Sequence, residues 1–192
     1  MKRIEEVYRE LLFQSIEKKN SSMTQSYLAK ALGMSLSVVN LALKPLSNMN
    51  AIKIKQRSFD VIDKKKILFY WASIRNIEKD IIYKTRVEKP VKKIESEMPS
   101  DVVYAAYSAY KFKFNDVPAD YSEVYVYSDD LKEIEKRFPK NDKTPNLFVL
   151  KKDKNMKKAT IALIFIDLWN LKEWYAKDFL KAMEERLNGI LE

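Results

Sequence analysis

The stretch TQSYLAKALGMSLSVVNLALKPL, residues 24–46, predicts two short helices joined by a tight turn. Thr24 is placed to cap a helix over Gln25–Leu32, because a Thr hydroxyl accepts a hydrogen bond from the first free N–H groups of a helix. Ser35 is placed in the same way before a second helix, which runs from Leu36 to about Leu46.

Three positions in this stretch have the spacing of a helix-turn-helix motif. Ala29 is small where the two helices would cross closely, and Gly33 accepts the positive φ that the turn needs. Val39 is apolar where the second helix would pack on the first. We expect the rest of this core to come from Leu28, Leu32, Leu36, Leu43 and Leu46.

The flanking sequence predicts a winged helix-turn-helix domain over residues 1–88. Three helices followed by a two-stranded hairpin, the wing, define that arrangement. The flanking elements that we expect are a helix over Arg3–Lys19, hairpin strands over Ala51–Gln56 and Phe59–Asp63, a helix over Lys64–Asp80 and a strand over Ile81–Val87.

The positive charge of the chain lies in this half. The chain carries a net +9, and residues 1–88 have 17 Lys and Arg against 9 Asp and Glu, whereas residues 89–192 have 19 against 18. A localised positive field attracts polyanions, of which nucleic acid is the usual one. This distribution favours DNA binding by the N-terminal half over a simple role in solubility.

The second helix of the motif has a predicted recognition face. If Val39 and Leu43 face the core, then Ser37, Asn40 and Lys44 face outward, where they can bond to base edges or phosphates. Val38 and Leu41 flank this face, and Val38 is placed for a thymine methyl group. The helix has no Arg, the commonest guanine reader, which favours modest or A·T-biased specificity. We also expect Pro45 to kink or shorten the helix, since it cannot donate to Leu41.

The predicted wing alternates apolar and basic residues. Ile52 and Ile54 are expected to pack inward, while Lys53, Lys55 and Arg57 share the opposite parity and suit the phosphate backbone or a minor groove. A solvated edge strand protected by charge is the alternative. The residues expected to contact DNA are Thr24, Gln25, Ser35, Ser37, Val38, Asn40, Lys44, Lys53, Lys55, Gln56 and Arg57; for Ser35, capping is the role that we favour.

The second half, residues 89–192, predicts a small α/β domain, so the fold class expected for the chain is α+β. Pro90 and the polar residues 92–96 mark the boundary between the halves. The expected elements are helices over Asp101–Phe112, Asp129–Phe138 and Glu173–Leu191, strands over Val124–Tyr127 and Asn146–Lys151, and an apolar strand or buried turn over Thr160–Phe165.

Three segments between Ser108 and Leu187 carry a resemblance to a known family: SAYKFKFNDVPADYSEVYVYSDD, NLFVLKKD and IALIFIDLWNLKEWYAKDFLKAMEERL. They resemble the C-terminal domain of AbiEi-type winged-helix regulators, the antitoxin partners of nucleotidyltransferase toxins. The sequence departs from that pattern at Phe165-Ile166, where a more polar approach to Asp167 is typical. The resemblance implies a transcriptional regulator, with a nucleotidyltransferase-type toxin as a partner.

Two other functions compete with DNA-binding regulation. Asp120 and, ten residues later, Asp130-Leu131-Lys132 loosely match the Asp…Asp-x-Lys arrangement of metal-dependent nucleases, although an acid that opens a helix is also explained by capping. A protein–protein adaptor built on a winged helix without DNA is the third function. Asp167 stands alone within an apolar run, and we expect it to cap the turn before the last helix.

Composition limits the remaining chemistry. The chain has neither Cys nor His, which excludes disulfides, zinc sites built on these residues and His general bases. No apolar run reaches the length of about 18 residues that spans a bilayer, and the charged N-terminus does not resemble a signal peptide. We therefore expect a cytoplasmic protein without enzymatic activity, cofactor or metal. Its Tyr- and Trp-rich second half is expected to supply core residues and protein contacts, including those of a homodimer.

Overall fold

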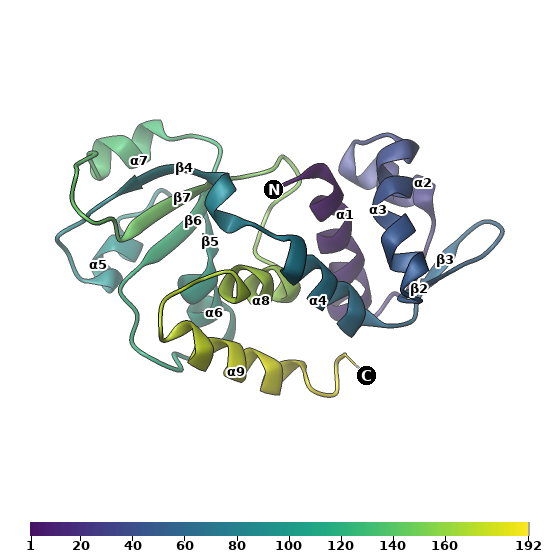
Figure 1. Ribbon diagram of the computed structural model, residues 1–192. Helices are drawn as coiled ribbons and strands as arrows, with labels where there is room; N and C mark the ends of the chain where they lie inside the picture. Colours follow the sequence, from purple (N-terminus) through teal and green to yellow (C-terminus); the bar gives the residue numbers. More distant parts are fainter. Residues whose placement is uncertain (192) are drawn as a thin grey trace. The chain divides into compact units, whose positions relative to one another are not determined.

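The computed structural model describes residues 1–191 and confirms the α+β class, with two small sheets (Figure 1). The chain divides into two compact units. Unit 1 consists of Met1–Arg75, Thr160–Ile166 and the described residues from Met183 to Leu191, and unit 2 of Asn76–Ala159 and Asp167–Ala182. Glu192, the last residue of the second predicted domain, lies outside the described residues.

The division between the units falls at Arg75 and not at Glu88, where the sequence places it. The reason is the strand Ile81–Thr85, which the sequence pattern assigns to the N-terminal domain but which pairs with the strand Leu147–Lys151 in the sheet of unit 2. The last residues of the chain also return to unit 1, a long-range connection that local sequence patterns do not reveal.

Unit 1 combines helices with a three-stranded antiparallel sheet of order β1-β3-β2. Its elements are α1 (Arg3–Leu12), the π-helical turn η1 (Phe13–Glu17), β1 (Ser22–Met23), α2 (Gln25–Leu32), α3 (Leu36–Asn48), β2 (Ile52–Ile54), β3 (Phe59–Val61) and α4 (Lys64–Ile74). The bounds of α2 are those that the sequence predicts. The short strand β1, which pairs with β3, is not among the predicted elements.

Three expectations about this unit are corrected. Pro45 does not shorten the helix, because α3 continues to Asn48, slightly past the expected end at about Leu46, and the buried side chains of Leu43 and Leu46 hold its last turns against the core. Leu36 and Ile54, expected in the core, are each 48% exposed. Leu36 is the first residue of α3, and Ile54 lies towards the tip of the β2–β3 hairpin, which extends away from the helices in Figure 1.

The helices α1 and α4 are joined through a buried carboxylate. Glu5 of α1 accepts hydrogen bonds from Trp71 Nε1 at 3.2 Å and from the Arg75 guanidinium at 3.4 Å, and all three side chains are buried. A buried charge is tolerated only when it is paired in this way. The pairing therefore fixes the position of α4 on α1.

Segments from the end of the chain complete the core of unit 1. Phe165 is fully buried and meets the Phe69 ring of α4 edge-on, at a centroid distance of 5.7 Å. The Glu17 carboxylate, in η1, accepts a hydrogen bond from the Ile161 N–H at 2.8 Å and so caps the first turn of the helix that carries Phe165. The core of unit 1 thus draws on residues far apart in the sequence.

Unit 2 is built on a mixed four-stranded sheet of order β4-β7-β6-β5, in which only β6 and β7 are parallel. Its elements are the 3-10 turn η2 (Ile77–Asp80), β4 (Ile81–Thr85), α5 (Val91–Ser96), β5 (Val103–Ala105), α6 (Ala106–Phe114), β6 (Val124–Ser128), α7 (Lys132–Arg137) and β7 (Leu147–Lys151). The helices α8 (Ile161–Trp169) and α9 (Ala176–Leu187) each contribute to both units.

Both faces of this sheet are covered. Ile94 of α5 and Ile134 and Phe138 of the α7 region pack with Val126 and Val149 on one face. On the other face, Tyr107 of α6 contacts Tyr125 of β6 and Phe179 of α9.

Several elements of unit 2 differ from those expected. The predicted helix Asp101–Phe112 is the strand β5 followed by α6, and α5 lies where the sequence predicts only a polar boundary segment. The apolar segment expected as a strand or turn is the start of α8, because a short apolar run does not distinguish a buried strand from a buried helix. The helix expected over Asp129–Phe138 is shortened to α7.

We predict that Phe165→Ala lowers the free energy of unfolding by about 3–5 kcal/mol, the usual loss when a large buried aromatic side chain is removed. Ile62→Ala is the matched control, since Ile62 lies in the same unit and is exposed; it should change stability by less than about 0.5 kcal/mol. Urea denaturation of the full chain measures both values. Equal effects of the two substitutions would contradict a role for Phe165 in the core of unit 1.

Candidate nucleic-acid interface

The turn between α2 and α3 has the conformation that the sequence predicts. Gly33 ends α2 in the left-handed region, with φ +57° and ψ +46°. Thr24 Oγ1 accepts a hydrogen bond from the Tyr27 N–H at 3.0 Å, and Ser35 Oγ accepts one from the Val38 N–H at 3.4 Å. The capping roles of Thr24 and Ser35 are therefore confirmed, while Gln25, the first residue of α2, is half-buried.

The two sides of α3 separate as expected. Val39, Leu43 and Leu46 are buried, whereas the predicted DNA contacts Ser37, Asn40 and Lys44 are exposed. The result is a polar helix face that is open to solvent.

Two apolar residues flank this face differently. Val38, the candidate for a thymine methyl group, is half-buried. Leu41 lies next to Asn40 and is 63% exposed, a large apolar side chain left outside the core.

The hairpin carries the remaining predicted contacts. Lys53 and Lys55 of the β2 region, together with Gln56 and Arg57 at the tip, are exposed. The structure distinguishes among these cations, since Lys55 forms an ion pair with Asp60 of β3.

Asp60 is a residue that the sequence analysis missed. It lies directly opposite Lys53 in the strand register, and the hydrogen bond from Lys55 holds the pKa of its carboxyl below the ordinary value, with help from Ser22. The alternation of β3 could have revealed it, because a residue between the buried Phe59 and Val61 must share a face with the wing lysines.

The acidic residues weighed for metal-dependent chemistry belong to unit 2. Asp120 is exposed in the loop before β6, and Asp130 follows that strand, where its Oδ1 accepts a hydrogen bond from the Lys132 N–H at 2.9 Å at the start of α7. Within residues 1–191, no three Asp, Glu, His or Cys side chains are grouped closely enough to hold a metal ion.

Asp167, which we expected to cap the turn before the last helix, has a partner on the sheet. It lies inside α8, is fully buried, and its two carboxylate oxygens accept the Tyr127 hydroxyl at 2.8 and 2.9 Å. A carboxylate is tolerated within this apolar run because the Tyr127 hydroxyl on the sheet donates to it. The neighbouring residues in the sequence do not indicate this partner.

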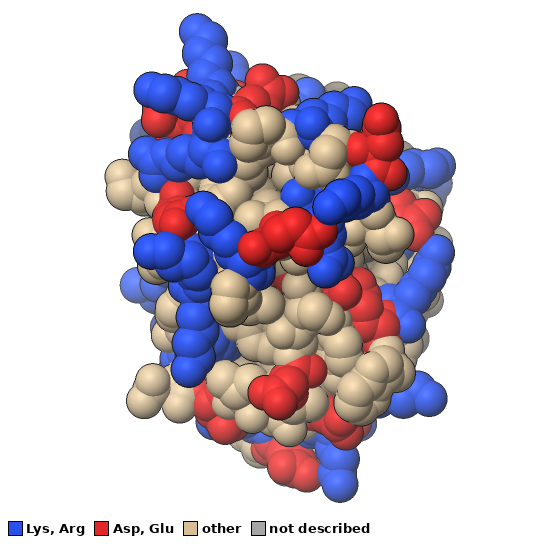
Figure 2. All heavy atoms as spheres, turned by 90° about the vertical axis from the view of Figure 1, so that its left-hand side faces the viewer, with Lys and Arg blue, Asp and Glu red and all other residues tan. Residues whose placement is uncertain are grey.

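The aromatic residues of the second half are mostly core residues. Tyr107, Tyr110 and Tyr127 are fully buried, whereas Trp174 is 76% exposed. Figure 2 shows one face of the molecule, and there Lys and Arg side chains stand beside Asp and Glu side chains. No described helix is both long and apolar enough to cross a membrane.

In comparisons with protein-family models, curated proteins and solved structures, no match to this chain was found.

We predict that Lys55→Met raises the pKa of the Asp60 carboxyl towards its ordinary value, because the largest cause of the lowered pKa is the hydrogen bond from Lys55. Lys53→Met is the matched control: its attraction to Asp60 contributes least, so the rise should be smaller. Carboxyl ¹³C NMR titration of the full chain gives both pKa values. An equal rise in the two variants would show that Lys55 has no special contact with Asp60.

Proposed function

We propose that the chain is a transcriptional regulator that binds duplex DNA through unit 1, acting as a winged helix-turn-helix. One observation carries the proposal: α3 buries Val39 and Leu43 on one side and leaves Ser37, Asn40 and Lys44 exposed on the other. A helix of this kind, second in a helix-turn-helix and followed by a basic hairpin, suits the major groove.

Each exposed side chain has a role in this proposal. Asn40 offers the paired donor and acceptor that match an adenine edge, and Ser37 bonds to either bases or phosphates. Lys44, Lys53 and Arg57 neutralise phosphates, while Lys55 contributes less because it is already paired with Asp60. Leu41 is placed to contact thymine methyl groups, which agrees with an A·T preference in a helix that has no Arg.

For unit 2 we propose protein contacts. The resemblance to AbiEi-type regulators supports an antitoxin and autoregulator whose partner is a nucleotidyltransferase-type toxin. A homodimer would present two copies of α3 to two half-sites of an operator. We place the protein in the cytoplasm, and propose neither a catalytic activity nor a metal or other cofactor.

A protein–protein adaptor is the second candidate function. It is favoured by the apolar side chains that unit 1 exposes, Leu36, Leu41 and Ile54. The two candidates differ in their response to salt, because an apolar protein contact does not release counterions from DNA.

We predict that the full chain binds duplex DNA, with an affinity that falls steeply as salt rises. Replacing Lys44, Lys53 and Arg57 together by Ala should weaken binding to all sequences. It should also make the slope of log binding constant against log salt concentration less negative, by about 0.9 for each phosphate that is no longer neutralised. Fluorescence anisotropy at several salt concentrations measures both effects.

The matched control replaces Lys93, Lys136 and Lys143 of unit 2 by Ala, which removes the same charge from exposed lysines beside carboxylates. It should leave the slope unchanged. If the full chain shows no binding to duplex DNA at low salt, the proposal fails and the adaptor is favoured.

We predict that Asn40→Ala alters sequence preference more than overall affinity. Binding should weaken by about 1–3 kcal/mol at the base pair that Asn40 contacts, with little change on random DNA. Selection of preferred sites from a randomised duplex library, followed by titration of the selected site, measures this difference. Ser47→Ala is the control, since Ser47 is half-buried near the other end of α3. Equal weakening on selected and random DNA would argue against base contact by Asn40.

A further inference from the structure

The sheet of unit 2 ends in β4, and a groove of about 920 Å³ lies at that edge. The groove is lined by residues 81–84 of β4, the loop 140–145, Glu78 and Phe148. Ile82 is 41% exposed there, as the extra residue of a bulge between Ile81 and Tyr83. An edge strand of this kind offers backbone N–H and C=O groups to an added strand.

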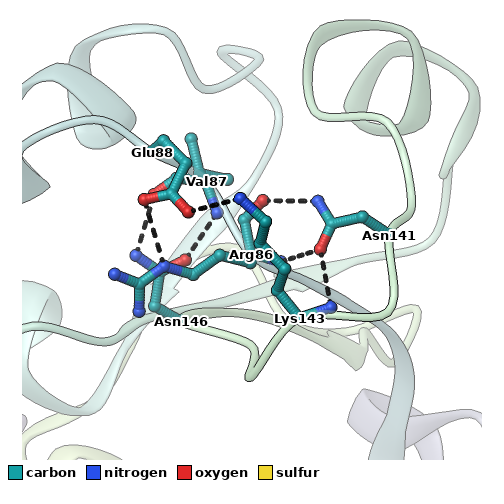
Figure 3. Close-up of polar contacts among 6 residues, drawn as sticks. All are labelled: Arg86, Val87, Glu88, Asn141, Lys143 and Asn146. Atoms are coloured by element: carbon teal, nitrogen blue, oxygen red, sulfur yellow. Dashed lines mark hydrogen bonds and ion pairs between the residues drawn. The ribbon is translucent and has the colours of Figure 1, made fainter.

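Two asparagine side chains show which way the backbone groups of this edge point (Figure 3). The Asn146 amide faces Val87, accepting its N–H at 2.8 Å and donating to its C=O at 3.1 Å. The Asn141 amide faces Arg86 in the same manner, donating to its C=O at 2.8 Å and accepting its N–H at 3.4 Å. Each side chain thus takes the place of a neighbouring strand at one residue.

These contacts show to which side the backbone N–H and C=O groups of Lys84 point. Thr85 C=O points towards β7, where it accepts the Asn146 N–H at 3.1 Å, whereas Arg86 faces Asn141 on the opposite side. Because the directions alternate along a strand, Lys84 faces the same way as Arg86, to the side of β4 where the described residues add no further strand to the sheet. A chain laid in the groove would continue the pairing that Asn141 begins.

The charges of the groove select among possible strands. The groove is lined by three cations, Lys84, Lys140 and Lys143, and by the carboxylates of Glu78 and Asp142. Glu78 is paired with Lys172 at 2.6 Å and is also attracted to Lys84, so the lining keeps a small positive excess. A lysine on an edge strand disfavours pairing with a second copy, because two positive edges would meet. The same lysine favours a strand that brings a carboxylate.

We propose that the β4 edge binds an extended segment of another protein in which acidic and apolar residues alternate. The segment would pair its backbone with Lys84 and set a carboxylate beside the Lys84 ammonium. Its apolar side chains would lie on the opposite face of the added strand, beside Tyr83, because Lys84 shares its own face with its register partner Phe148. This site is independent of the DNA-binding proposal, and neither proposal requires the other.

The test uses the full chain labelled with ¹⁵N and the peptide acetyl-Val-Glu-Val-Glu-Val-amide. We expect saturable amide shifts centred on Lys84 and slower hydrogen exchange of the Lys84 N–H. Lys84→Glu should weaken binding about fivefold or more, since an attraction worth up to about fivefold becomes a repulsion. Lys136→Glu, the same charge change at an exposed lysine of α7 outside the groove, should alter the affinity by less than about twofold.

Several results would overturn the proposal. One is the absence of saturable binding at millimolar peptide. Equal affinity for the peptide with Lys in place of Glu would show that charge does not select the strand. Retained affinity after N-methylation of the central valine and its neighbours, which removes their backbone donors, would show that no strand is added. Protection of the Lys84 N–H in the protein alone, together with a dimer in sedimentation, would assign the edge to a second copy.

Discussion

The left-handed turn at Gly33 sets the direction in which α3 leaves α2. A β-carbon at this position would meet no heavy atom within 4 Å, so the constraint is the backbone conformation itself and not crowding. Once the turn is made, burial of Val39 and Leu43 determines how α3 is rotated about its axis, and the polar side chains face outward as a consequence. The exposed face of α3 is therefore a result of the turn together with the core.

The distribution of charge shows how folding changes what a sequence count suggests. A count of Lys and Arg in residues 1–88 gives every cation the same weight. In the structure, Arg75 is buried against Glu5, and Lys55 is paired with Asp60. The field that unit 1 presents to a polyanion thus depends on fewer cations than the count implies.

Local rules were reliable where local interactions decide the structure. The bounds of α2, its Thr24 cap and the turn at Gly33 follow from residues within a few positions of one another. Two of the errors concern long-range contacts. The two-residue strand β1 exists because Met23 pairs with Phe59, and β4 belongs to unit 2 because its partner is β7. The exposure of Leu36 was also not predicted, because helical periodicity does not show which turns of the helix are covered by other elements.

The core of unit 2 explains why a count of tyrosines is a poor guide to a partner surface. The Tyr127 hydroxyl donates to buried Asp167, and the hydroxyls of Tyr107 and Tyr125 donate to Glu173. Burial raises the pKa of the Tyr107 and Tyr125 hydroxyls well above the ordinary value, so they remain donors, and the Glu173 carboxylate that accepts from both reinforces the shift. Rings and hydroxyls are therefore both engaged within the unit. Surface for a partner must come from groups that the core leaves open, such as the backbone of Lys84 at the sheet edge and the exposed ring of Trp174.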